Sequence, residues 1–207
     1  MILLNNFLAI RSTKRAVFLT YGRRRSHLVG FGWDALNGEG WGVLTSVTES
    51  WRYIGDIYHK KPHGRGIMRY VNQTKYVGNF VQGLRDGLGE IVNKDGTSAP
   101  GEKGVYIKNI FAPNGIMVEV TVINKHGVPI QYGKVALNKF DSVRTHVDRI
   151  GTVMDWDRRR RFRLVLNNGS AMVDVIGCVI DPKESSSIEY SSWDLDGTPE
   201  IIAHSLC

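Results

Sequence analysis

The chain has 207 residues, a mass of 23.2 kDa and a formal net charge of +7, and 42% of its residues are hydrophobic. This length and composition predict one elongated folded domain or two small ones rather than a disordered chain. No apolar run approaches the roughly 18 residues of a membrane-spanning helix. The apolar stretch in the first ten residues is too short for a secretory signal, and it lacks the basic segment with which such a signal begins.

The two cysteines, Cys178 and Cys207, provide neither a disulfide framework nor a metal-ligand spacing. We therefore expect no cofactor and no metal, and an intracellular, reducing compartment is the simplest location. An N-terminus rich in arginine and free of acids also resembles an organelle-targeting sequence. However, Ala16–Tyr21 is typical of a strand in a folded body, so organelle targeting is not favoured.

Charge is distributed unevenly along the chain. Residues 1–33 contain basic residues and no acid, whereas most of the charged residues in 181–207 are acidic. The two ends could pair with each other or could each be solvated on their own surface. We predict a basic N-terminal segment with one strand over residues 1–29 and an acidic tail over residues 181–207.

One pattern occurs twice in the central part of the chain, with an offset of 23 residues. Each copy reads Tyr-x-Gly, eight intervening residues, then Gly-x-Gly. The copies consist of Tyr53, Gly55, Gly64 and Gly66, and of Tyr76, Gly78, Gly87 and Gly89. A period of about 20 to 50 residues indicates stacked supersecondary units that cannot bury their apolar faces alone.

Each copy has the local pattern of a β-hairpin. Tyr53, Gly55 and Ile57 alternate along one face of a strand, and the polar run His59–Gly64 contains a proline, which predicts a turn over the whole run. A second strand is predicted from Gly66. The two tyrosines would stack between successive hairpins and would stabilise the fold by about 1.5–3 kcal/mol each if fully buried.

This pattern resembles the MORN (membrane occupation and recognition nexus) repeat, a family of stacked β-hairpins. The resemblance covers residues 30–102, with clear copies at 53–75 and 76–98 and a degenerate copy at 30–52. The degenerate copy contains Gly32-Trp33 and Gly40-Trp41-Gly42. The family usually has an aromatic two residues after its first glycine, where Phe80 fits and Ile57 fits loosely. After residue 98, only Gly101 lies at the position expected from the 23-residue spacing. The sequence therefore leaves open whether a fourth copy follows.

The remaining sequence predicts a second small β-rich unit over residues 103–180. Its expected strands are Ile116–Ile123, Ile130–Tyr132, Val135–Leu137 and a hairpin of Arg161–Leu166 with Ala171–Ile176 around the turn Asn167–Gly169. The only plausible helix lies between Asn138 and Ile150. The predicted fold class is mainly β: a short single-layer array of MORN-type β-hairpins followed by this second unit.

The sequence offers no catalytic pattern. The six histidines are scattered: His27, His59, His63, His126, His146 and His204. None belongs to a zinc, nucleophile-elbow or phosphate-loop motif, and repeat glycines explain Gly30–Gly42 better than a nucleotide loop does. Some MORN-like proteins carry a methyltransferase or kinase domain, but nothing here resembles either active site. We expect a non-enzymatic protein.

Clusters of arginine are the strongest binding feature outside the repeats. They comprise Arg23, Arg24, Arg25, Arg158, Arg159, Arg160, Arg161 and Arg163. Guanidinium groups suit the phosphates of RNA, DNA or anionic lipid headgroups. The alternative is a solvated surface in which Asp155 and Asp157 pair with part of the run.

Two functions therefore remain. The first is a scaffold or assembly subunit whose repeat surface binds a protein partner or a second copy, as the MORN resemblance implies. The second is a phosphate-binding module for nucleic acid or anionic membrane. The scaffold is favoured because Phe162 is the only aromatic residue inside the main arginine cluster, whereas nucleic-acid readers usually interleave several.

Overall fold

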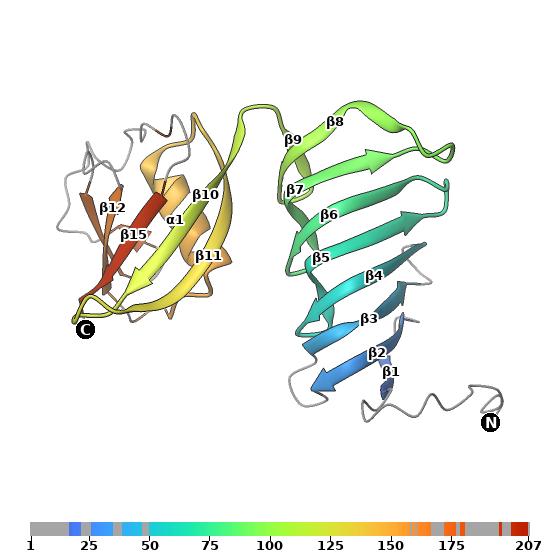
Figure 1. Cartoon of the computed structure of the whole chain (residues 1–207), viewed down its shortest axis with the longest axis horizontal. Coiled ribbons are helices and arrows are strands. Elements are labelled where there is room, and N and C mark those ends of the chain that lie inside the picture. The colour runs from blue at the N-terminus through green and yellow to red at the C-terminus, as the bar shows by residue number, and fades with distance from the viewer. Residues whose placement is uncertain are drawn as a thin grey trace.

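The computed structural model describes residues 17–21, 26–34, 39–46, 50–157, 159, 161–166, 172–176, 179–180, 195 and 200–206. These residues form two β-sheets and one helix (Figure 1). A hairpin array comes first in the chain and a second small β unit follows it. The fold class predicted from the sequence is therefore confirmed.

The first sheet, which we call the repeat sheet, is an antiparallel meander of nine strands in the described residues. Each strand pairs with the next one in the chain, and Figure 1 shows them stacked in chain order as a single layer. The strands are β1 Val17–Tyr21, β2 Ser26–Asp34, β3 Glu39–Ser46, β4 Trp51–Tyr58, β5 Lys61–Tyr70, β6 Lys75–Val81, β7 Leu84–Val92, β8 Ser98–Ile107 and β9 Ile110–Ala112.

Three successive turns on one side of the repeat sheet have the same conformation, with positive φ at both residues. They are His59–Lys60, Gln82–Gly83 and Lys108–Asn109. Two-residue turns of this kind match the right-handed twist of a hairpin. The predicted turn over His59–Gly64 is therefore wrong in its extent, because the chain re-enters the sheet at Lys61.

Pro62 lies inside β5, where it pairs with Ile57. It is tolerated because the strand register shifts between this pair and the pair of Gly55 with Gly66, so a bulge replaces regular ladder bonds. Its carbonyl oxygen accepts a hydrogen bond from the amide of Gly83 at 2.8 Å. This proline therefore ties one hairpin to the next.

The second unit is a six-stranded sheet in the described residues, with the order β11-β10-β15-β12-β13-β14. Only β10 and β15 pair in parallel; the other neighbours are antiparallel. The strands are β10 Gly115–Ile123, β11 Pro129–Asn138, β12 Arg161–Leu166, β13 Met172–Ile176, β14 Val179–Ile180 and β15 Glu200–Ser205.

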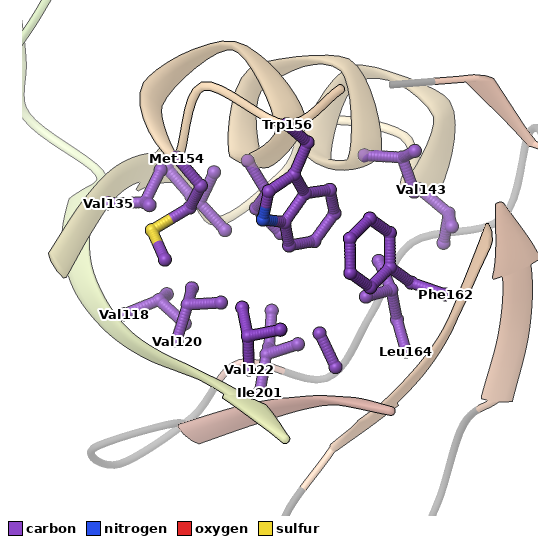
Figure 2. Close-up of a cluster of buried hydrophobic side chains, with 14 of the residues drawn as sticks. Val118, Val120, Val122, Val135, Val143, Met154, Trp156, Phe162, Leu164 and Ile201 are labelled. Carbon is purple, nitrogen blue, oxygen red and sulfur yellow. The ribbon is translucent and has the colours of Figure 1, made fainter. Parts of the chain in front are cut away.

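Helix α1, Val143–Val153, covers one face of this sheet (Figures 1 and 2). The side chain of Ser142 caps it by accepting the amide of Thr145 at 3.3 Å. Between helix and sheet lies a closed apolar core, in which the rings of Trp156 and Phe162 stack at 4.4 Å. Figure 2 shows valines of β10 facing these rings from the other side.

The structure divides the chain at places that differ from the predicted domain limits. β8 and β9 belong to the repeat sheet, so the array continues past residue 102 to Ala112. β15 lies in the predicted acidic tail, yet it pairs with both β10 and β12. Its residues alternate in burial, with Ile201 and Ala203 fully buried, and this apolar face places it in the sheet despite the acids before it.

Candidate functional site

A row of glycines crosses seven strands of the repeat sheet, from β2 to β8. The pairing register places them opposite one another in the order Gly30, Gly42, Gly55, Gly66, Gly78, Gly89 and Gly104. We call this line the glycine row. It separates the repeat sheet into two flanks and runs perpendicular to the strands.

On one face of the sheet, tyrosine rings lie over the glycine row. A Cβ atom on Gly66 would overlap the ring of Tyr53, and one on Gly89 would overlap the ring of Tyr76. The Tyr53 hydroxyl donates toward the carbonyl oxygens of Asp56 (2.7 Å) and His63 (2.9 Å). The glycines are therefore required because each repeat places a ring where a side chain would otherwise be.

This face, which we call the core face, is held together by aromatic contacts between hairpins. Phe80 makes edge-to-face contacts with Tyr53 at 4.9 Å and with Tyr76 at 5.1 Å, and Tyr76 contacts Tyr106 at 5.0 Å. All four rings are at most 1% exposed. Burial raises the pKa of the Tyr53 hydroxyl, and Asp56 raises it further. The Tyr53 hydroxyl therefore stays protonated, and the side chain has a structural role.

The hairpin of β8 and β9 continues the glycine and aromatic pattern of the two clear copies, displaced by three residues from the 23-residue spacing. Gly104, and not Gly101, pairs with Gly89, and Tyr106 follows it at the spacing with which Phe80 follows Gly78. The extra residues lie in a bulge of β8, where 99–102 oppose one residue of β7. An ungapped comparison could not find this continuation, whereas one that allows a gap in the turn region could.

The opposite side of the repeat sheet, which we call the open face, carries a different set of side chains. One flank of the glycine row has Ile54, Ile67 and Val77, followed by the ion pair of Glu90 with Lys103. The other flank has Trp41, Arg65, Asn79 and Leu88. Trp41 and Leu88 are 48% and 54% exposed, which is high for large apolar side chains.

Two hollows follow the glycine row on the open face. The larger, of about 470 Å³, lies between Ile54, Val77 and Trp41, and the smaller, of about 360 Å³, lies at Gly89 and Lys103. Both are lined by Val77 and Leu88, so they form one groove across the strands. The central residues of the Gly-x-Gly motifs, Arg65 and Leu88, line the groove, a role that the repeat pattern alone did not reveal.

A buried ion pair joins the two units. Arg149 of α1 donates to the carboxylate of Asp86 on β7, and both side chains are about 5% exposed. Arg149 also donates to the carbonyl oxygen of Ala136 at 2.5 Å. No sequence pattern indicates this pair, since the residues are 63 positions apart and lie in different units.

Asp86 and His63 occupy equivalent positions of the two clear repeats. The side chain of each accepts a hydrogen bond from a backbone amide in the following turn. The Asp86 carboxylate accepts the amide of Lys108 at 3.3 Å, and Nδ1 of His63 accepts the amide of Gln82 at 3.4 Å. Burial lowers the pKa of His63, and nearby Asp56 partly offsets this. Each side chain therefore holds the turn of the following hairpin.

Beside the ion pair lies a cleft of about 510 Å³ between the two units, which we call the inter-unit cleft. β5, β6 and β7 form one wall, and β10, β11 and the end of α1 form the other. It shares Arg65, Asn79 and Leu88 with the groove of the open face. The groove and the cleft are therefore continuous.

The predicted arginine site is only partly within the described residues. Arg23, Arg24, Arg25, Arg158 and Arg160 lie outside them, as do Cys178, Cys207 and the predicted turn Asn167–Gly169. Arg159, Arg161 and Arg163 are exposed, and the last two alternate along β12 with the buried Phe162. The amide of Arg159 donates to the side chain of Asp157 at 2.9 Å. None of the three lines the groove or the cleft.

Other site types receive no support from the described residues. No group of three or more histidine, cysteine, aspartate or glutamate side chains there could hold a metal ion. Within the same part of the chain, no helix has the length and apolarity needed to cross a membrane.

The fold and the glycine row define a repeat protein built from stacked β-hairpins. A family model, that of the MORN repeat, matches residues 53–75 and 76–98. The chain therefore carries two MORN repeats, at the limits predicted from the sequence. MORN repeats occur in modules for protein interaction or membrane association. None of the curated proteins compared with the chain matches it.

Proposed function

We propose that the chain is a non-enzymatic scaffold or assembly subunit that binds a protein partner, or a second copy of itself, on the open face of its repeat sheet. The observation that carries the proposal is the groove along the glycine row. Its flanks leave the side chains of Trp41 and Leu88 about half exposed. Exposed large apolar side chains beside a continuous groove are typical of interaction sites.

The architecture supports this proposal. The rings of Tyr53, Tyr76 and Tyr106 build the aromatic core on the other face, and the side chains that line the groove are not part of that core. An array of this kind presents a long, regular surface, and its partner is selected by the side chains at the variable positions. Here those positions hold Trp41, Arg65 and Leu88.

The test uses the full chain with single substitutions in the groove. Leu88→Asp and Ile67→Asp place a charge on either flank, and we expect each to reduce strongly the recovery of a partner in pull-downs from the native source. Val71→Asp is the matched control, because Val71 is 73% exposed and lies in a turn away from the groove. Light scattering after size exclusion reports self-association of the same variants. Equal recovery and an equal oligomeric state in all variants would overturn the proposal.

A second candidate is phosphate binding through the arginines near β12. Its support is the exposure of Arg159, Arg161 and Arg163 along a short segment. If these residues bind phosphate, changing all three to serine will reduce retention on heparin or RNA and flatten its salt dependence. Unchanged retention at low salt would remove this candidate.

A further inference from the structure

β11 is the terminal strand of the second sheet, and part of its outer edge is open. The outward carbonyl oxygens of Ala136 and Asn138 accept hydrogen bonds from Arg149 (2.5 Å) and from Nε2 of His146 (2.9 Å). Main-chain groups on alternate residues of a strand face the same side. Tyr132 and Lys134 therefore also direct their N–H and C=O groups away from β10.

Tyr132 and Lys134 pair with β10 on their inner side, and no described strand pairs with them on the outer edge of β11. Helix α1 hydrogen-bonds to this edge at Asn138 and Ala136, and the carbonyl oxygen of Met154 at its end accepts the side-chain amide of Gln131 at 2.8 Å. An open stretch of strand edge is a template for another extended chain. This stretch does not face bulk solvent alone, because Tyr132 and Lys134 line the inter-unit cleft.

The cleft has the dimensions and lining for an extended peptide. Its volume of about 510 Å³ is bounded on the far side by the ends of β5, β6 and β7. Leu88, Met117 and Met154 contribute apolar surface, and methionine side chains adapt to different partners. Because the cleft continues into the groove of the open face, a chain that leaves the edge of β11 enters that groove.

The charged side chains of the cleft determine which sign of charge a bound peptide should carry. The Asp86 carboxylate is neutralised by Arg149, and Glu119 pairs with Lys134 at 2.6 Å. The guanidinium of Arg65 makes no ion pair within the described residues, and Arg65 lines both the cleft and the groove. Among the charged side chains that line the cleft, Arg65 therefore offers a guanidinium that no ion pair in the described part of the chain neutralises, while the nearby Asp56 carboxylate, which is not part of the lining, accepts the Arg65 amide at 2.9 Å.

We infer that the inter-unit cleft binds an extended, acidic segment of a partner protein, which adds a strand to β11 at Tyr132 and Lys134 and directs a carboxylate to Arg65. The inference rests on the proposed function and specifies how the partner is held. Main-chain hydrogen bonds to β11 provide the affinity, and the arginine with the apolar lining provides the preference for sequence.

The experiment uses a phage-displayed library of random linear peptides, selected on the full chain. We expect enriched peptides to alternate apolar residues with Asp or Glu. Synthetic copies are then titrated by fluorescence anisotropy. Lys134→Pro removes the outward N–H and leaves the pairing with β10 in place, so it should weaken binding about fivefold or more relative to Lys134→Ala, which keeps that N–H.

Two further comparisons separate the charge and the main-chain contributions. Arg65→Glu should weaken binding, whereas Arg69→Glu, on the same strand and the same face but outside the cleft, should not. N-methylation of the peptide at alternate positions should abolish binding in one register only. This comparison works with the unchanged protein, so it decides the question even where Lys134→Pro does not fold.

The outcomes distinguish this inference from the proposed function. Absence of enriched peptides, equal affinity of the Lys134→Pro and Lys134→Ala variants, or insensitivity to N-methylation would overturn the strand-addition inference. If enriched peptides lose binding on Leu88→Asp in such a case, the groove stays a binding site and only the role of β11 fails. If partner recovery is insensitive to every groove variant, the proposed function fails first.

Discussion

The two units of this chain bury their side chains in opposite ways. The second unit closes its core between a sheet and helix α1, so one face of that sheet is covered by the chain itself. The repeat sheet has a single layer and builds its core from rings that lie over glycines on one face. The repeat hairpins therefore pack against one another through one face. The open face holds the ion pair of Asp86 with Arg149, and along the glycine row it carries the groove that is available for binding.

The largest expected effect concerns the contact that joins these two units. Arg149→Met leaves the Asp86 carboxylate buried without a partner, which should lower the free energy of unfolding by about 3–5 kcal/mol. Urea unfolding measures this loss. Replacing both residues with apolar ones should recover most of it, because no charge is then left buried. Arg144→Met, at an exposed position of the same helix, is the control, and an equal loss in that variant would contradict the role of the pair.

The core face of the repeat sheet gives the next largest effect. Gly66→Ala inserts a methyl group into the space of the Tyr53 ring, so we expect a loss of about 1–3 kcal/mol. Tyr53→Leu removes the ring, and the two substitutions together should therefore cost less than the sum of their separate effects. A double-mutant cycle from urea unfolding measures this coupling. Strict additivity would show that the ring and the glycine do not constrain each other.

Much of the repeat sheet could be predicted from the sequence, because its stability depends on local, periodic contacts. The tyrosines and the glycines at a fixed spacing were sufficient to indicate hairpins. Whether the pattern continues after residue 98 stayed open at the sequence level, because the bulge of β8 shifts Gly104 and Tyr106 from the 23-residue spacing. The predicted turn near Pro62 was too long. Proline is usually excluded from strands because it has no N–H for the ladder, but the bulge at this place does not need that hydrogen bond.

The second unit was harder to predict, because its contacts join distant segments. The composition of residues 181–207 indicated an acidic tail, yet β15 inserts between β10 and β12. Likewise, Asp86 and Arg149 are 63 positions apart, and only the folded chain brings them together. The open face was not predicted, since alternation shows that two faces differ but does not show which one is covered.

We expect a smaller effect of pH on the free energy of unfolding, from one histidine in each unit. Burial lowers the pKa of His146, and likewise that of His63, below the ordinary value of 6.5. The unfolded chain then binds protons that the folded chain does not, so stability is full above about pH 6.5 and falls as the pH decreases below it. Melting temperatures between neutral and mildly acidic pH measure the effect. His146→Gln and His63→Asn should each flatten the slope, with the larger change for His146, which is fully buried.

The smallest expected effect concerns the open face. Leu88→Asp should change the free energy of unfolding by no more than about 0.5 kcal/mol, because Leu88 is 54% exposed and lies outside the core. The equivalent test of the core face, Phe80→Ala, should cost about 3–5 kcal/mol. If Leu88→Asp destabilised the chain as strongly as Phe80→Ala, the open face would be structural and the comparison of the two faces would fail.

Site-specific photo-crosslinking of the full chain in its native cells tests whether the open face binds a partner. A photoreactive phenylalanine analogue is placed at Leu88 on the open face or at Lys94, which is exposed in the turn before β8. Binding on the open face predicts a defined protein adduct from position 88, either with a partner or with a second copy, and none from position 94. Adducts from position 94 with none from position 88 would contradict the assignment of the open face as the interaction surface.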